Sequence, residues 1–159
     1  MTRIFLLPGE YHVSKEPVVI ETLVGSCVSV CLYNTKTGRA AMNHFLQDKP
    51  ARETDCDIGQ YGSTATEYII KALMKFDSDR SHYRAQVFGG AVVIKTNSDE
   101  CNIGQKNIDI ARKMLADYRI RIIREEIGGT RGRRVRFDTA TSTVFCRFAG
   151  QIGKKYRRG

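Results

Sequence analysis

The feature that most constrains the fold is a strand–turn–strand pattern in the first third of the chain. Residues 28–33 alternate in the manner of a strand, with Val28 and Leu32 on the same side. Residues 34–38, Asn-Thr-Lys-Thr-Gly, have the composition of a turn, because Asn and Gly tolerate backbone angles that other residues avoid. Residues 39–46 then return as a second strand. This pattern predicts a β-hairpin.

Two longer segments have the period of amphipathic helices. They cover residues 63–76 and 102–118. Thr64 and Glu67 have the spacing of a capping box at the start of the first helix. The expected apolar stripes are Ala65, Tyr68, Ile69, Ala72, Leu73 and Phe76 in the first helix and Ile108, Ala111, Leu115 and Tyr118 in the second.

Further strands are expected between and after the helices, at residues 17–20, 85–88, 120–126, 134–137 and 143–147. The last two are expected to form a second hairpin. Together the segments predict the α+β class, with two main helices packed on a mainly antiparallel β framework.

The length of 159 residues fits one domain, expected over residues 1–153, followed by a basic tail at 154–159 that we expect to be disordered. The net charge is +9, and residues 1–118 contribute none of it. Residues 119–159 carry 12 basic and 3 acidic side chains. Such a basic end can attract nucleic acid, anionic lipid or an acidic protein, or it can be a solvated face with a frayed tail.

Five cysteines are present, at positions 27, 31, 56, 101 and 146, and no two have the C-x-x-C spacing of a zinc or redox site. They complete no metal-binding set, so no metal is expected. Free thiols are expected in a reducing compartment. The sequence has no secretory signal and no apolar run of about 18 residues, which favours the cytoplasm without membrane insertion.

Cys27 follows Gly25 and Ser26 directly before the first hairpin strand, where a turn can expose and aim its thiol. If the hairpin turn is centred near residue 36, Cys27 faces a position between 44 and 46. An imidazole at His44 can then lie close to the thiol, although a one-residue slip would place it on the other face. The alternative is a strand histidine with an ordinary structural hydrogen bond.

A cysteine nucleophile needs such a partner, because a free thiol with a pKa of about 8.5 is mostly protonated at neutral pH. A neighbouring imidazole takes the proton and later gives it to a leaving amine. A third group usually orients the imidazole. Thr22 is the nearest hydroxyl and Glu21 the nearest carboxylate.

Several blocks of the sequence together resemble the CheD family of chemoreceptor glutamine deamidases. The blocks cover most of the chain in a specific order. They are residues 21–33 (ETLVGSCVSVCLY), 38–46 (GRAAMNHFL), 61–65 (YGSTA), 87–91 (VFGGA), 102–107 (NIGQKN) and 126–133 (EIGGTRGR).

The resemblance implies a cysteine-hydrolase fold related to the catalytic domains of cytotoxic necrotizing factor toxins. It also implies a Cys-His-Thr triad, which maps onto Cys27, His44 and Thr22. The threonine position is open by one residue, with Glu21 immediately before it. Backbone N–H groups near Gly25, Ser26 and Cys27 are expected to stabilise the oxyanion.

The substrate implied by the resemblance is a glutamine side chain on the cytoplasmic helices of a chemoreceptor, which becomes glutamate with release of ammonia. The resemblance implies that this reaction requires no cofactor and no metal. The family also implies the phosphatase CheC as a partner in organisms that have it. A basic face would suit docking on an acidic receptor bundle, with affinity that falls as salt rises.

Two other functions are compatible with parts of the sequence. One is a non-catalytic chemotaxis adaptor that binds CheC or receptors. The other is a nucleic-acid-binding domain, which the basic end suggests but which lacks the interleaved aromatic motifs of common RNA-binding folds. We therefore expect no nucleic acid partner. The basic residues Arg131, Arg133 and Arg134 are expected to form a solvated loop, and the glycine pairs at 89–90 and 128–129 to end strands.

Overall fold

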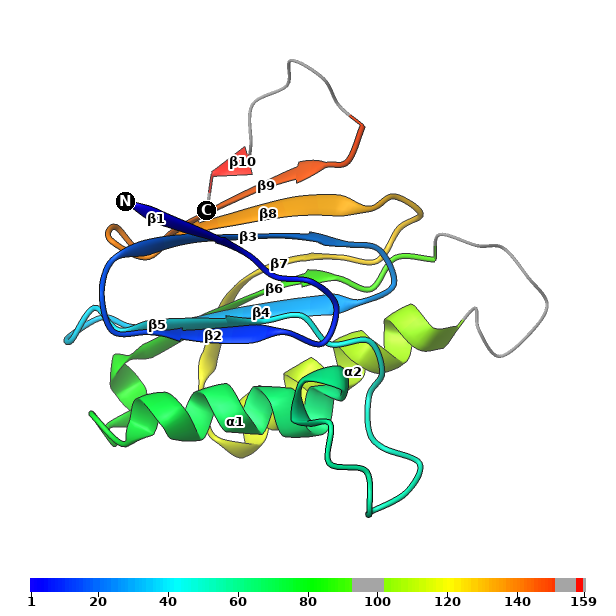
Figure 1. Cartoon of the computed structure of the whole chain (residues 1–159), viewed down its shortest axis with the longest axis horizontal. Coiled ribbons are helices and arrows are strands. Elements are labelled where there is room, and N and C mark those ends of the chain that lie inside the picture. Colours follow the sequence, from blue (N-terminus) through cyan, green and yellow to red (C-terminus); the bar gives the residue numbers. More distant parts are fainter. Residues whose placement is uncertain (93–101, 151–156, 159) are drawn as a thin grey trace.

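A computed structural model describes residues 1–92 and 102–150, together with the backbone of residues 157–158. Figure 1 shows three layers: two helices lie against one sheet, and a second sheet lies against the opposite face of the first. The α+β class and the two main helices predicted from the sequence are confirmed. The sheets are mixed, since six strand pairings are antiparallel and two are parallel.

The outer sheet has the strand order β1-β3-β8-β9-β10, and the central sheet has the order β2-β5-β4-β6-β7. The parallel pairs are β1 with β3 and β6 with β7. The outer strands are β1 (Thr2–Phe5), β3 (Val18–Val24), β8 (Arg133–Asp138), β9 (Thr143–Phe148) and β10 (Arg157–Arg158). The central strands are β2 (Tyr11–Ser14), β4 (Val28–Asn34), β5 (Ala40–Asn43), β6 (Tyr83–Gly89) and β7 (Arg121–Ile127). The helices are α1 (Gly62–Met74) and α2 (Ile103–Asp117), with short 3-10 turns η1 (Ile58–Gln60) and η2 (Arg80–His82).

The central sheet is covered on both faces, so its middle strand is buried along its whole length. Val28, Val30 and Leu32 of β4 pack toward the helices, in one apolar cluster with α1 and α2. Cys31 and Tyr33 of the same strand pack toward the outer sheet. The alternation that predicted a strand therefore separates two cores rather than a core from solvent.

The predicted capping box at the start of the first helix is wrong. The helix begins at Gly62, and the residue before it, Tyr61, makes no side-chain cap bond. Thr64 lies inside the first turn, where its hydroxyl donates to the carbonyl oxygens of Ile58 and Tyr61. A capping box needs Thr at the N-cap and Glu at the third helical position, whereas here Thr64 itself occupies the third position and Glu67 the sixth.

The apolar stripe of the first helix is narrower than predicted, because Tyr68 and Phe76 are exposed by 41% and 51%. Phe76 lies beyond the end of α1, and its ring is covered by the guanidinium of Arg39 at 3.6 Å from the centroid. Tyr68 stacks at a tilt on Tyr11, with ring centroids 4.8 Å apart. Both aromatic side chains therefore pack at the edge of the core and not inside it.

The remaining differences concern the ends of the chain. Strands β1 and β2 were not predicted. Of the tail expected at 154–159, residues 154–156 and 159 lie outside the described residues, as does Cys101, whereas the backbone of Arg157 and Arg158 pairs with β9. Within the described ranges, neither helix has the length and apolar character that a membrane crossing requires.

Candidate active site

Cys27 lies in the short connection that carries the chain from β3 in the outer sheet to β4 in the central sheet. Its carbonyl oxygen accepts a hydrogen bond of 2.9 Å from the N–H of Gly90. Gly89 passes so close that a Cβ built on it would lie 2.2 Å from the same oxygen, and its φ of +111° is one that L side chains rarely adopt. The glycine pair predicted to end a strand therefore also supports the backbone of Cys27.

His44 lies one residue after the end of β5 at Asn43, whereas the sequence predicted a strand over residues 39–46 that would contain it. The ladder is interrupted because the side-chain oxygen of Asn43 accepts from the N–H of Val30. Val28 still pairs with Phe45, and the same register places His44 diagonal to Cys27 on one face of the hairpin. Diagonal neighbours of this kind remain within reach of long side chains.

Thr22, on β3, approaches His44 from the outer sheet. Its Oγ1 lies 2.7 Å from Nδ1 of His44 and donates a hydrogen bond of 2.8 Å to the carbonyl oxygen of Leu6. A hydroxyl has only one hydrogen, so Oγ1 must accept from an Nδ1–H of His44. This arrangement fixes the tautomer that leaves a lone pair on Nε2 of His44.

Glu21 does not take part in this contact. Its carboxylate lies on the opposite face of β3, 2.8 Å from the guanidinium of Arg3. The alternation of side chains along a strand explains the difference, because neighbouring residues point to opposite faces. Of the two candidates for the third position, Thr22 is the one that contacts His44.

Burial determines the protonation of both reacting groups. Burial lowers the pKa of His44 to about 4, with a smaller opposing effect from the carbonyl of Leu6, so its imidazole is neutral near pH 7. Burial also raises the pKa of the Cys27 thiol, while its own backbone N–H opposes the shift. Nε2 of His44 is buried and has no hydrogen-bond partner within the described part of the chain. The resting pair is thus a thiol and a neutral imidazole with a free lone pair.

The turn around Gly25 and Ser26 offers unpaired amide groups. Neither the Ser26 nor the Cys27 N–H donates to a backbone carbonyl among residues 1–92 and 102–150. The carbonyl of Gly25 accepts from the N–H of Ala91, which holds the turn in place. Amides that are fixed but not used can donate to a negatively charged oxygen.

Asn107 is a residue near the site that the sequence did not reveal. Its Nδ2 donates hydrogen bonds of 2.9 Å to the carbonyl oxygens of both Ser26 and Leu46. The first carbonyl precedes Cys27, and the second lies two residues after His44. Asn107 is fully buried on α2, so one amide group joins the two segments of the site. A polar residue next to the apolar stripe at Ile108 is the sequence signal that could have indicated it.

The basic loop at residues 131–134 was predicted to be solvated, but only part of it is exposed. Arg131 and Arg134 are exposed, but Arg133 is 6% exposed and donates to the carbonyl oxygen of Gly128. The expectation of solvation for Arg133 is therefore wrong. Its guanidinium binds the turn at Gly128 and lies over the ring of Phe148, so it fixes the loop.

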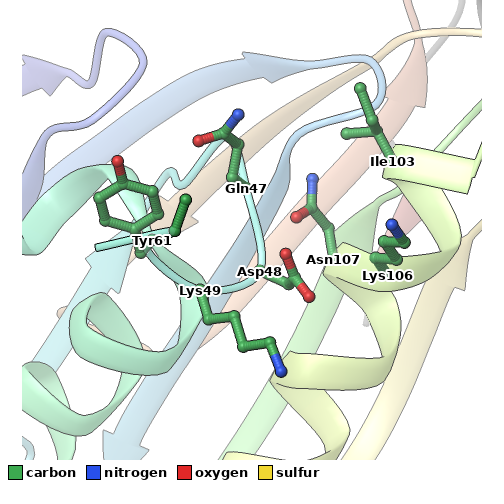
Figure 2. A pocket seen from close by; sticks show the side chains of 8 residues that line it. Gln47, Asp48, Lys49, Tyr61, Ile103, Lys106 and Asn107 are labelled. Carbon is green, nitrogen blue, oxygen red and sulfur yellow. The ribbon is translucent and has the colours of Figure 1, made fainter. Parts of the chain in front are cut away.

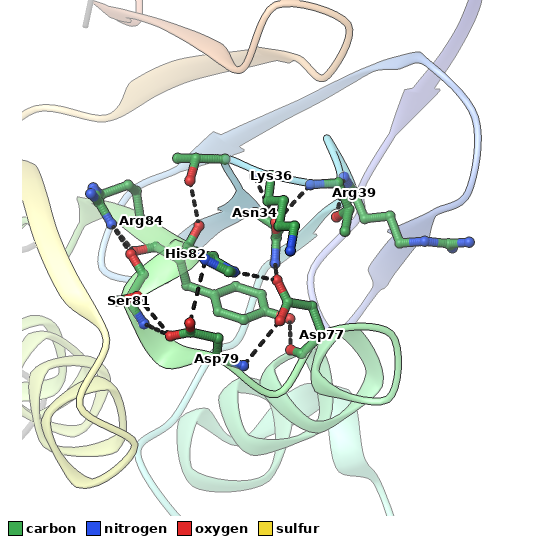
Figure 3. A network of polar contacts seen from close by, with 11 residues as sticks. Asn34, Lys36, Arg39, Asp77, Asp79, Ser81, His82 and Arg84 are labelled. Carbon is green, nitrogen blue, oxygen red and sulfur yellow. Dashed lines mark hydrogen bonds and ion pairs between the residues drawn. The ribbon is translucent and has the colours of Figure 1, made fainter.

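His82 lies away from this site, in a polar network at the other end of the central sheet (Figure 3). Its Nδ1 is 2.6 Å from Asp77, which also accepts from the side chain of Asn34. The two contacts lower the pKa of Asp77 to about 2. The network joins the β4–β5 turn to the segment before β6. Within the described residues no cluster of three or more His, Cys, Asp or Glu side chains could hold a metal ion.

Comparison with known proteins agrees with the resemblance seen in the sequence. A family model described as CheD chemotactic sensory transduction matches residues 46–148. The chain is similar to a protein of Trichlorobacter lovleyi named probable chemoreceptor glutamine deamidase CheD, with 37% identity over 88% of this chain and 86% of the relative. A relative in Shewanella oneidensis, named probable chemoreceptor glutamine deamidase CheD 2, is 40% identical over 91% of this chain and 75% of its own length. One in Geobacter sulfurreducens, named CheD 1, is 36% identical over 89% and 75%.

Proposed function

The chain belongs to the CheD family, and from that premise we propose that it deamidates glutamine side chains of chemoreceptors. The reaction converts a side-chain carboxamide to a carboxylate and releases ammonia. The observation that carries the proposal is the contact between Thr22 and His44, which leaves Nε2 of His44 free on the face that Cys27 shares. That arrangement is what a thiol nucleophile requires of its base.

In the proposed first step, Nε2 of His44 takes the proton of the Cys27 thiol as Sγ attacks the amide carbon. The carbonyl oxygen becomes an oxyanion, which the N–H groups of Ser26 and Cys27 stabilise. Gly25 contributes by allowing the turn that presents them. Collapse of the tetrahedral intermediate breaks the C–N bond, and the proton on Nε2 passes to the departing nitrogen, so that ammonia leaves and a thioester remains.

In the second step, water attacks the thioester carbon and gives a proton to Nε2 of His44. Collapse of the second intermediate breaks the C–S bond, and the same proton returns to Sγ of Cys27. The product is a glutamate side chain, and both enzyme groups are restored. The low pKa of His44 suits this cycle, because the imidazole must be neutral each time it takes a proton, first from Cys27 and then from water.

Thr22 acts in this scheme as a positioning residue. Its hydroxyl accepts from Nδ1–H of His44 and so keeps the tautomer with the lone pair on Nε2. It also favours the imidazolium that forms in each step, although less than a carboxylate would, because a hydroxyl carries no charge.

Three finer statements belong to the same proposal. The fold is that of the cysteine hydrolases that include the cytotoxic necrotizing factor toxins, as the family resemblance implies. The enzyme works in the cytoplasm on the cytoplasmic helices of receptors. Its partner is the phosphatase CheC in organisms that have it, and docking on an acidic receptor bundle weakens as salt rises.

The test is mass spectrometry of a purified chemoreceptor cytoplasmic fragment incubated with the protein. The wild type should convert specific glutamines to glutamates, and Cys27→Ser should not. Cys56→Ser is the matched control, because Cys56 is an exposed thiol outside the site and its loss should leave the rate unchanged. If the mass of the fragment does not change with wild type, or changes equally with Cys27→Ser, the catalytic proposal is wrong. The remaining hypothesis is then an adaptor that binds receptors without chemistry.

A further inference from the structure

Asn43, the last residue of β5, makes with its side chain a hydrogen bond that a regular strand makes with its main chain. Oδ1 of Asn43 accepts from the N–H of Val30 on β4 at 2.8 Å. In the register of the hairpin Val30 lies opposite Asn43, at a position where antiparallel strands exchange main-chain hydrogen bonds. The side-chain carbonyl of Asn43 therefore replaces a main-chain carbonyl in the ladder, one residue before His44.

The interruption of the ladder is short. Main-chain pairing of the two strands reaches Met42, opposite Cys31. It resumes where Phe45 and Val28 exchange hydrogen bonds of 3.0 and 3.2 Å. Each strand advances by three positions between these two pairs, so no residue is inserted as it would be in a β-bulge. A side-chain group between the main chains holds them further apart than a direct bond would, so the chain lies away from β4 only between the two pairs.

The main chain of His44 is held on its other side by the segment between β1 and β2. Its N–H donates to the carbonyl oxygen of Glu10 at 3.1 Å, and its carbonyl oxygen accepts from the N–H of Gly9 at 2.8 Å. The imidazole reaches Thr22 of the outer sheet. The distance between the main chain at His44 and β4 therefore sets how the ring lies between Thr22 and Cys27.

The chain is fixed again just after His44. The carbonyl oxygen of Leu46 accepts from Nδ2 of Asn107, which Figure 2 shows on α2 across a pocket from the segment of Gln47. His44 thus lies between two anchored residues, and the earlier one, Asn43, binds the strand that follows the nucleophile.

The amide of Asn43 is buried and oriented by two partners. Asn43 and Thr66 of α1 are both fully buried, and Nδ2 of Asn43 donates to Oγ1 of Thr66 at 3.4 Å. The N–H of Val30 can only donate, so Oδ1 must face β4 and Nδ2 must face α1. A buried N–H without an acceptor is destabilising, which keeps the amide in this position.

We propose that Asn43 is a positioning residue, which sets the place of the His44 imidazole by holding the two strands of the hairpin apart. Its effect on the rate rests on the proposed function, whereas its effect on the imidazole can be measured without substrate. If the side-chain acceptor is removed, the nearest substitute for the N–H of Val30 is the main-chain carbonyl of residue 43. Closure of the ladder would then carry His44 toward β4 and disrupt its contact of 2.7 Å with Thr22.

Proton NMR and initial rates test this placement, with Asn43→Ala compared to Asn34→Ala. Asn34 is the matched control, because it is a buried asparagine at the opposite end of the same hairpin (Figure 3) and its Oδ1 also accepts from backbone N–H groups. In isotope-labelled wild type the Nδ1–H of His44 should give a downfield proton signal protected from exchange, because it is buried against Thr22. Asn43→Ala should lose or shift this signal, and kcat on a receptor fragment should fall about 10- to 100-fold while KM stays within about twofold. Asn34→Ala should keep the signal, KM and kcat.

Two further variants serve if Asn43→Ala does not fold. In Asn43→Ser the oxygen lies one bond closer to the main chain and does not reach Val30, so signal and kcat should fall in the same way. Asn43→Asp keeps an oxygen that can accept from Val30 and should retain the signal and a kcat within about fivefold of wild type. Folded Asn43→Ala or Asn43→Ser with the wild-type signal and kcat, or folded Asn43→Asp that loses both, would overturn the inference. A wild type that shows the signal but converts no glutamine would overturn the proposed function, while the signal in the variants still decides the role of Asn43.

Discussion

The hydroxyl oxygen of Thr22 lies 2.7 Å from Nδ1 of His44, although Thr22 belongs to the outer sheet and His44 follows a strand of the central one. The contact exists only because the two sheets are packed face to face. It is buried, since both residues are 1% exposed. The packing of the sandwich therefore fixes the tautomer of His44, and with it the atom that can accept a proton from Cys27.

Replacing Thr22 by valine should lower kcat by about 10- to 100-fold, because the imidazole loses its hydrogen-bond acceptor while the general-base contribution is of the order of 10²–10⁴. Thr22→Ser keeps the hydroxyl and should retain most of the activity. Glu21→Gln changes the neighbouring side chain on the opposite face and should have little effect. Rates of ammonia release from a receptor fragment give the comparison. A larger loss in Glu21→Gln than in Thr22→Val would assign the third position to Glu21.

The low pKa of His44 predicts where activity is lost in acid. The base must be neutral, so kcat/KM should be constant through neutral pH and fall as the pH drops through about 4. A solvated histidine would instead give a midpoint near about 6.5. Rates measured from pH 8 down to about pH 3.5, with circular dichroism at each pH to verify folding, locate the midpoint. A fall in kcat/KM centred near pH 6.5 in folded protein would show that the active base is not a buried imidazole.

The same shift predicts a loss of stability in acid. The pKa of His44 is lower in the folded chain than in the unfolded one, so between pH 6.5 and about 4 the unfolded state binds the extra proton. The contribution of neutral His44 to the free energy of unfolding is therefore complete above pH 6.5. As the pH drops toward 4, the free energy of unfolding should fall by up to about 3 kcal/mol. Urea unfolding of wild type and His44→Gln at pH 7 and pH 4.5 checks this. A wild type that loses no more stability than the variant would show that His44 does not titrate as predicted.

Contacts within one short segment of chain could be predicted from the sequence, and contacts between distant segments could not. The register of the hairpin follows from a short turn, so the approach of Cys27 and His44 could be predicted before the structure was known. The turn is closed by Asn34, whose side chain accepts from two backbone N–H groups just after it. Thr22 needed the packing of one sheet on another, which no local pattern encodes. The family resemblance supplied that residue to within one position.

Asn107 could not be predicted for a related reason. It contacts Ser26 and Leu46 across 81 and 61 residues of chain, and its sequence environment is that of an ordinary amphipathic helix. The capping box at Thr64 was a local pattern that proved wrong, because the helix begins at Gly62, two residues before Thr64. The predictions that held were those in which one segment of chain determined the contact.

Asn107→Asp should be one of the more damaging isosteric changes in the protein. The carboxylate cannot donate to the carbonyl oxygens of Ser26 and Leu46, and it places three acceptors together in a buried site. We expect a loss of about 2–4 kcal/mol in the free energy of unfolding and a lower kcat at all pH values where the protein is folded. Asn102→Asp, at the exposed start of the same helix, is the control and should leave stability unchanged or slightly raise it. Urea unfolding followed by rate measurements on the folded variants separates the two effects.

Gly89→Ala tests whether the backbone of Cys27 must be held where it is. The φ of +111° at Gly89 strains any L residue, and the added Cβ would lie 2.2 Å from the carbonyl oxygen of Cys27. Because that oxygen belongs to the nucleophile's own peptide group, relief of the overlap must move Cys27. We expect a loss of about 2–4 kcal/mol in stability. Since a displacement of about 1 Å can cost roughly 10²-fold in rate, kcat should fall by a similar factor in the protein that remains folded.

Gly128→Ala provides the comparison that isolates this effect. Gly128 also has a positive φ, +76°, but no atom of the described residues lies within 4 Å of a Cβ built on it. The substitution therefore carries the backbone strain, about 1–2 kcal/mol, without the overlap. Its kcat should stay close to that of wild type, because the substitution keeps the N–H that donates to the carbonyl oxygen of Gly89 and adds no atom beside Cys27. If both variants lost activity equally, strain alone would explain the loss, and the close approach of Gly89 to Cys27 would have no separate part in catalysis.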